Sequence, residues 1–311
     1  MMKIFIYPIV FFSLSYFGLA QSEIISLYPE GIPCKSDLKI ETSYDRSGRI
    51  FKKVGRPELW HYPASNPKNH AALLIIPGGG YYGLWFDKEG VDIANWANGL
   101  GISAFVLKYR LPYWENEDCK DQVALMDALR AMRIIRKNAI NWNLNSEKIG
   151  VIGFSAGGHL ASTLSTHYDK GLEKSTLSIE KFSSRPDFSA LIYPVITMKK
   201  PNVNLGSREN LLGKIPDREK LDYFSNELWV NHETPPTILI HASDDKVVVP
   251  ENSLTYYKAL IDHGVNAELH VWQNGGHGFA ISEASGSVRN WLSVIKEWMM
   301  NNEIIENVIV D

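Results

Sequence analysis

The amino-acid sequence predicts an α/β fold with a mostly parallel, twisted sheet and helices on both of its faces. Segments with the apolar runs of strands alternate with segments that have helical spacing, which is typical of right-handed strand-helix-strand units. The strand-like segments at 71–76 and 103–107 have the mostly apolar character expected for strands buried on both faces. Of the 311 residues, 45% are hydrophobic and 22% are charged, which excludes a disordered chain and a multi-span membrane protein.

The first half of the chain contains the clearest elements. An apolar run at 71–76 ends at Pro77 and three glycines, which predicts a buried strand that enters a turn. The segment 91–100 places Ile93, Trp96 and Leu100 on one face of a helix. The remaining elements predicted here are strands at 103–107 and 148–154, an amphipathic helix with arginines on its polar side at 121–138, and a helix at 156–166.

The second half of the chain resumes this alternation after an irregular stretch. That stretch, 196–233, contains lysines and prolines and one expected helix at 218–229, and we interpret it as an insertion near the active site. The segment 21–67 is expected to be an N-terminal extension of β character, and 21–311 to be a single domain. The other predicted elements are strands at 190–193, 237–241 and 267–272 and helices at 254–263 and 288–300.

Residues 1–20 have the pattern of a secretory signal peptide. Lys3 precedes an apolar run at 4–19, and Gly18 and Ala20 are small residues at the expected cleavage site. Pro8 and the shortness of the run disfavour a membrane anchor, which needs roughly 20 apolar residues. The sequence therefore predicts a secreted or periplasmic protein with no stable membrane insertion after cleavage.

The net charge and the cysteine and histidine content indicate which partners, disulfides and metal sites are expected. The net charge of −3, without clustered basic residues, argues against a nucleic-acid partner. Cys34 and Cys119 are compatible either with one disulfide or with two free thiols. No metal is expected, because the histidines are scattered without the spacing of metal ligands. The sequence leaves the oligomeric state open.

A strand, the motif Gly153-Phe154-Ser155-Ala156-Gly157 and a helix start follow one another directly. This order is typical of a nucleophile elbow, in which flanking glycines allow a sharp turn that exposes the serine hydroxyl. A side chain at either glycine would collide with the neighbouring strand or helix. Ser155 is therefore the candidate nucleophile.

Three glycines after the first core strand, Gly78 to Gly80, suit an oxyanion hole. Such a site needs backbone N–H groups that approach the substrate without an intervening Cβ. The expected donors are the amides of Gly79, Gly80 and Ala156. A phosphate-binding loop is disfavoured, because no Lys-Ser/Thr pair follows and the dinucleotide spacing is absent.

The candidate acid and base follow the last two predicted strands. Asp244 and Asp245 come after the strand at 237–241, and His277 lies in a glycine-rich turn after the strand at 267–272. The chain order of serine, acid and histidine is that of α/β-hydrolases. Asp245 is the favoured acid and Asp244 remains the alternative, whereas His241 is interpreted as a structural residue at a strand end.

The segments PGGGYYGLWFDKEG, GFSAGGHLA, PPTILIHASDDKVVVPENSLTYYKAL and GGHGF resemble the bacterial carbohydrate-esterase branch of the α/β-hydrolases, whose members include acetyl xylan esterases. The resemblance extends over roughly 57–298. It implies a sheet of about eight strands, a serine carboxylester hydrolase activity and no cofactor. It assigns Ser155, Asp245 and His277 to the nucleophile, acid and base.

The expected substrate is a small acyl group on a plant polysaccharide such as xylan. The insertion is too short for a deep lipid-binding lid, and aromatic side chains are expected at the rim of the site, where they could stack on sugar rings. A feruloyl or broad-specificity carboxylesterase is the alternative, followed by a peptidase of the prolyl-oligopeptidase type. The aromatic residues assigned to the rim are Tyr81, Tyr82, Trp85 and Trp114.

Overall fold

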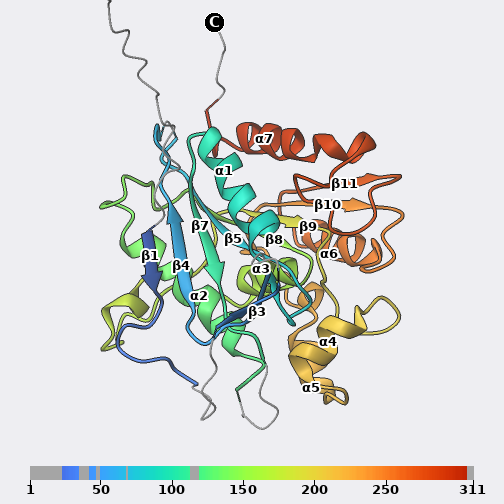
Figure 1. Cartoon of the computed structure of the whole chain (residues 1–311), viewed down its shortest axis with the longest axis horizontal. Coiled ribbons are helices and arrows are strands. Elements are labelled where there is room, and N and C mark those ends of the chain that lie inside the picture. Colours follow the sequence, from blue (N-terminus) through green and yellow to red (C-terminus); the bar gives the residue numbers. More distant parts are fainter. Residues whose placement is uncertain (1–22, 35–41, 47–49, 68, 113–118, 307–311) are drawn as a thin grey trace, which may run out of the picture.

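An eight-stranded sheet forms the centre of the molecule (Figure 1). The computed structural model describes residues 23–34, 42–46, 50–67, 69–112 and 119–306, so the predicted leader at 1–20 and Trp114 lie outside the described residues. The strands, in their order across the sheet, are β1 (Glu23–Ser26), β4 (Glu58–Tyr62), β7 (Ser103–Lys108), β5 (Ala72–Ile76), β8 (Ile149–Phe154), β9 (Ser189–Ile192), β10 (Thr237–Ala242) and β11 (Ala267–Trp272).

The six strands from β7 to β11 run parallel, as the sequence predicts. Each of them lies within one or two residues of its predicted position. Two strands of the segment 21–67, β1 and β4, add an antiparallel edge to this sheet. A separate antiparallel sheet is formed by β2 (Ser43–Tyr44), β3 (Ile50–Lys53) and β6 (Leu84–Trp85).

Helices cover both faces of the main sheet. Figure 1 shows α1 (Asp92–Gly99) and α7 (Trp291–Asn301) on one side, and α2 (Val123–Lys137), α3 (Ala156–Thr166) and α6 (Glu251–Asp262) on the other. Every residue of β5, β7 and β8 is buried between these layers, which explains why they are mostly apolar; the exceptions are Ser103 and Lys108 at the two ends of β7. In the described residues outside the segment 196–233, the short helical turns are η1 (Asp87–Val91), η2 (Ser178–Lys181) and η4 (Gly286–Asn290).

The segment 196–233 contains more helix than the single helix predicted at 218–229. It forms α4 (Leu205–Leu212), α5 (Arg218–Tyr223) and η3 (Asn226–Leu228), and the two helices lie together at one end of the molecule (Figure 1). The side chain of Asn204 accepts the Ser207 amide and so caps α4. Helical periodicity did not reveal α4, because only two of its apolar residues are buried.

Cys34 and Cys119 form a disulfide, with their Cα atoms 6.3 Å apart. This result decides between the two alternatives that the sequence left open. The bridge ties the stretch after β1 to the start of α2. Among the described residues, the helices are too short or too polar to cross a membrane.

Candidate active site

The predicted functional residues gather at the carboxyl ends of four parallel strands. The glycine turn follows β5, Ser155 follows β8, and Asp245 and His277 follow β10 and β11. Because parallel strands end at the same edge of a sheet, residues that are distant in sequence meet there.

Ser155 occupies a strained turn between β8 and α3. Its φ of +52° and ψ of −118° lie outside the regions that ordinary residues favour. A Cβ on Gly157 would collide with the carbonyl oxygens of Ile76 and Pro77, and a Cβ on Gly153 would collide with Ala161. The two flanking glycines therefore allow the close packing that the turn needs, as the sequence predicts.

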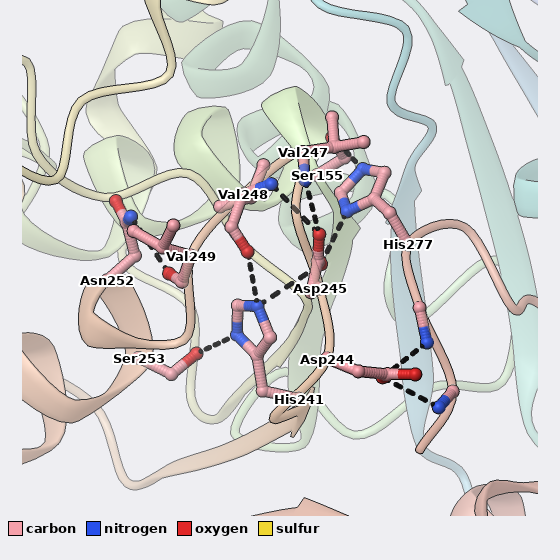
Figure 2. A network of polar contacts seen from close by, with 12 residues as sticks. Ser155, His241, Asp244, Asp245, Val247, Val248, Val249, Asn252, Ser253 and His277 are labelled. Carbon is pink, nitrogen blue, oxygen red and sulfur yellow. Dashed lines mark hydrogen bonds and ion pairs between the residues drawn. The ribbon is translucent and has the colours of Figure 1, made fainter. Parts of the chain in front are cut away.

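Ser155, His277 and Asp245 form a continuous chain of hydrogen bonds (Figure 2). The Ser155 Oγ lies 2.9 Å from His277 Nε2, and His277 Nδ1 lies 2.7 Å from Asp245 Oδ2. Asp244 has a different environment, because its Oδ1 accepts the amides of Gly275 and Gly276 at 2.9 and 2.8 Å. Asp245 thus contacts the histidine, whereas Asp244 fixes the turn that carries it.

The Asp245 carboxylate is held by several donors. Its Oδ1 accepts the amides of Val247 and Val248, each at 2.9 Å. Burial raises the pKa of Asp245, but hydrogen bonds from His241 and His277, the charge of His277 and the Val248 amide outweigh it and hold this pKa well below its usual range. Asp245 is therefore ionised at neutral pH.

His241 supports the acid in a way that the sequence did not reveal. Its side chain is fully buried, and its Nε2 lies 3.3 Å from Asp245 Oδ2 and 2.9 Å from the Val248 carbonyl oxygen. Because both partners of Nε2 are acceptor oxygens, Nε2 carries a proton, and Nδ1 accepts the Ser253 hydroxyl at 2.7 Å (Figure 2). The only sequence signal was its position at a strand end, four residues before the acid.

The glycine turn has the geometry that anion binding requires. Gly79 and Gly80 have backbone φ angles of +132° and +63°, which residues other than glycine rarely adopt. Across the described part of the chain, neither amide donates to another protein group, whereas the Gly78 amide donates to Glu89 Oε2 at 2.8 Å. Ala156 begins α3, so its amide is not needed by the helix.

A cavity of about 300 Å³ opens in front of Ser155. It places Gly79, Gly80 and His277 next to the serine, as the sequence predicts. The other residues that line it are Trp85, Lys88, Glu89, Asn204, Ser207, Val247 and Gly278. In the residues that the structure describes, no group of three or more His, Cys, Asp or Glu side chains could hold a metal ion.

The predicted rim aromatics have different positions. Trp85 lines the cavity, and the Lys88 Nζ lies 4.3 Å from the centre of its ring. Tyr82 is exposed but is not among the cavity residues. The placement of Tyr81 at the rim is wrong, because this side chain is buried and its hydroxyl donates to His159 Nδ1 at 2.7 Å. The positive φ of Tyr81 turns the side chain into the core.

Comparisons with known proteins identify enzymes whose sequences are similar to this chain. The chain is 33% identical over 271 residues to an acetylxylan esterase of Xylanibacter ruminicola and 34% identical over 226 residues to an endo-1,4-beta-xylanase B of Butyrivibrio fibrisolvens. These matches cover 83% and 73% of this chain, but only 53% and 35% of the relatives, so the chain corresponds to about half or less of their length.

A solved structure has the same fold over nearly the whole chain. The acetyl ester-xyloside bifunctional hydrolase from Caldicellulosiruptor lactoaceticus aligns with a TM-score of 0.80 at 35% identity, and the alignment covers 91% of this chain and 97% of that one. The model of the BD-FAE family matches residues 60–260, which include Ser155 and Asp245, whereas His277 lies beyond the match. Because that match takes in more than half of the chain, the protein belongs to the BD-FAE family of α/β-hydrolases.

Proposed function

We propose that the protein is a serine carboxylester hydrolase that removes acetyl groups from xylan-like polysaccharides. The observation that carries this proposal is the hydrogen-bonded chain of Ser155, His277 and Asp245 at the wall of a small cavity. An acetylxylan esterase and an acetyl ester-xyloside hydrolase among the similar proteins support the choice of substrate.

The reaction begins with attack by Ser155 on the ester carbonyl carbon. His277 Nε2 takes the hydroxyl proton as the Oγ–carbon bond forms, and the carbonyl π electrons move to the oxygen. The amides of Gly79, Gly80 and Ala156 stabilise the resulting oxyanion. The carbon–oxygen bond to the sugar then breaks, and the imidazolium donates its proton to the departing sugar oxygen.

Hydrolysis of the acetyl-serine repeats these steps with water. His277 accepts a proton from the water, which attacks the acyl carbon, and the imidazolium then protonates Ser155 Oγ as the bond between Oγ and the acyl carbon breaks and acetic acid leaves. Asp245 remains a carboxylate throughout, orienting the imidazole through Nδ1–H and stabilising its positive charge. Its donors keep Asp245 ionised although burial alone would raise its pKa.

The size of the cavity supports a short acyl group. About 300 Å³ is at the lower end of the range for ligand pockets, and this space must hold both the acyl group and part of the alcohol. Trp85 supplies a flat apolar surface that suits a sugar ring. A cavity of this kind favours acetyl over long acyl chains and over the bulkier feruloyl group.

A series of 4-nitrophenyl esters tests the acyl preference. We expect kcat/KM to fall steeply from acetate to butyrate to octanoate, because the longer chains exceed the cavity. Equal or higher rates on octanoate would contradict the acetyl assignment. Faster hydrolysis of feruloyl esters than of acetylated xylan would favour a feruloyl esterase instead.

We also propose that the protein acts outside the cytoplasm. The apolar segment at 4–19 supports export, and the Cys34–Cys119 disulfide is typical of oxidising compartments. Mass spectrometry of the protein from cell fractions tests this. An exported chain that begins at Gln21 is expected, and a full-length cytoplasmic chain would overturn the proposal.

A further inference from the structure

Glu89 is a buried carboxyl group in the cavity wall that the reaction scheme does not use. Its side chain belongs to η1, the π-helical turn before α1, and only 3% of the residue is exposed. It lines the same cavity as Ser155 and His277. Burial of an ionisable group is unfavourable unless its oxygens are satisfied, so its contacts are informative.

The two oxygens of Glu89 contact the two sides of the active site. Oε2 accepts the amide of Gly78 at 2.8 Å, and Oε1 accepts the hydroxyl of Tyr193 at 3.0 Å. The ring of Tyr193 packs against the ring of His277, with 4.9 Å between their centres. The Glu89 carboxyl group therefore links the glycine turn to Tyr193, the residue that packs against His277.

Gly78 is the point at which the glycine turn meets the nucleophile elbow. A Cβ at this position would lie 2.5 Å from the Phe154 carbonyl oxygen and 3.0 Å from Ser155 Cβ. The bond to Glu89 therefore orients the peptide that rests on the elbow. The amides of Gly79 and Gly80 follow in the same turn, so a rotation at Gly78 redirects them.

Tyr193 is also held in an unusual conformation. Its φ is +38°, and its amide donates to the Ile240 carbonyl oxygen at 2.7 Å. Its ring packs between His277 and Phe279, whose ring centre lies 4.6 Å away. The hydroxyl bond to Glu89 fixes the end of a side chain whose ring contacts the base, His277.

The surroundings of Glu89 only partly offset the cost of its burial. Burial raises the pKa of Glu89, and the Gly78 amide, the Tyr193 hydroxyl, and the charges of Lys88 and His277 oppose this change. A well-packed apolar residue would avoid this cost. A contribution to stability therefore does not explain the carboxyl group at this position, whereas its hydrogen bonds to Gly78 and Tyr193 do.

We propose that Glu89 is a positioning residue that aligns the Gly78–Gly80 turn and, through Tyr193, the ring of His277 with Ser155. The inference rests on the proposed esterase function. Glu89 is expected to affect kcat more than KM, because the groups that it positions act on the oxyanion and on the transferred proton, which appear only in the transition state.

Three variants separate the contacts of Glu89. Glu89→Ala removes both, Tyr193→Phe removes only the hydroxyl contact, and Glu89→Gln keeps an oxygen for the Gly78 amide while its NH₂ faces the Tyr193 hydroxyl. We expect kcat on 4-nitrophenyl acetate to fall roughly 30- to 100-fold in Glu89→Ala, with KM within about threefold, because misaligned oxyanion donors cost less than the factor of about 10²–10³ that the loss of one donor costs. Smaller losses are expected for Tyr193→Phe and Glu89→Gln.

The affinity of a trifluoromethyl ketone provides the decisive readout. This inhibitor forms a tetrahedral adduct with the serine, so its affinity is expected to fall in Glu89→Ala by a factor similar to that of kcat. Glu147→Gln, an exposed position outside the site, is the matched control and is expected to change neither quantity. If Glu89→Ala does not fold, Glu89→Gln and Tyr193→Phe are measured in the same way.

Two results would overturn the inference. One is unchanged kcat in the folded Glu89 variants, and the other is a loss of kcat without any loss of ketone affinity. Failure of the proposed function has a different signature, because the wild-type protein would then hydrolyse no ester and bind no ketone.

Discussion

Asp244 and Asp245 have different partners because the turn after β10 directs their side chains in different directions. Asp245 accepts from His277, and Asp244 accepts from Gly275 and Gly276. The sequence could place both carboxylates beside the histidine, because the strand before them is clear. It could not fully separate them, because the direction of each side chain depends on the turn and on His241.

Substitution of the two aspartates by asparagine separates their functions. Asp245→Asn is expected to lower kcat by roughly 10⁴-fold, because the amide favours the wrong imidazole tautomer. Asp244→Asn retains an acceptor for the amides at 275 and 276 and is expected to lower kcat less than about tenfold. Steady-state kinetics on 4-nitrophenyl acetate measures both. A larger loss in Asp244→Asn would reverse the assignment of the acid.

The insertion helix α4 connects the two halves of the site. The Asn204 side-chain amide donates to the Val247 carbonyl oxygen beside the acid, and the Asn210 side-chain amide donates to the Gly80 carbonyl oxygen, each at 2.7 Å. The sequence located the insertion but not α4, since capping and contacts with distant loops stabilise this helix more than an apolar face does. Strands such as β5 and β8 were predictable because their burial leaves a continuous apolar run.

Removal of the Asn210 contact tests this connection. Asn210→Ala is expected to lower kcat about tenfold with little change in KM, because the Gly80 carbonyl loses the donor that fixes the turn. Glu209→Ala, at an exposed position on the same helix, is the control for general effects on α4. Equal kinetics in the two variants would show that α4 does not align the turn.

The whole molecule is held together by contacts between segments that are far apart in sequence. The arginines of α2 were predicted on its polar side, yet they are largely buried. Arg130 donates to the Leu27 carbonyl oxygen at 2.9 Å, and Arg136 donates to that of Ser183 at 3.1 Å. Helical periodicity identified the helix but not the segments that cover it, because those partners lie elsewhere in the chain. The disulfide and the burial of Tyr81 could not be predicted for the same reason, because their partners also lie in distant segments.

Removal of the disulfide by substitution tests one of these long-range links. Cys34 and Cys119 are 85 residues apart, and closing a loop of this size stabilises the folded state by about 4.6 kcal/mol in the chain-entropy model. The paired Cys34→Ala and Cys119→Ala substitution is therefore expected to lower Tm by roughly 7 °C, because the unfolding entropy of a chain of 311 residues is about 0.65 kcal/mol/K. Unchanged melting in the variant would indicate that the bridge adds no stability.

The stability of the molecule is expected to fall in mild acid. Burial lowers the pKa of His159 to about 4, whereas the ordinary value is 6.5. Between pH 6.5 and 4, His159 binds a proton in the unfolded chain but not in the folded chain. The free energy of unfolding is therefore highest above pH 6.5 and decreases as the pH falls toward 4. The loss is on the order of 3 kcal/mol. Urea unfolding at pH 7 and 4.5 measures it.

A matched variant identifies the residue responsible. His159→Gln cannot titrate, so its free energy of unfolding is expected to change less between these two pH values than that of the wild type. His263→Gln, at an exposed position, is expected to retain the full dependence. An identical pH dependence in His159→Gln and in the wild type would assign the acid sensitivity to other groups.

Acetate release from acetylated xylan by wild-type protein and by Ser155→Ala is the measurement that tests the proposed function most directly. The variant removes the attacking oxygen while leaving a small side chain in the elbow. We expect the wild type to release acetate and the folded variant to lose at least about 10³-fold of that rate. A Ser155→Ala protein that deacetylates xylan as fast as the wild type would contradict the proposed mechanism.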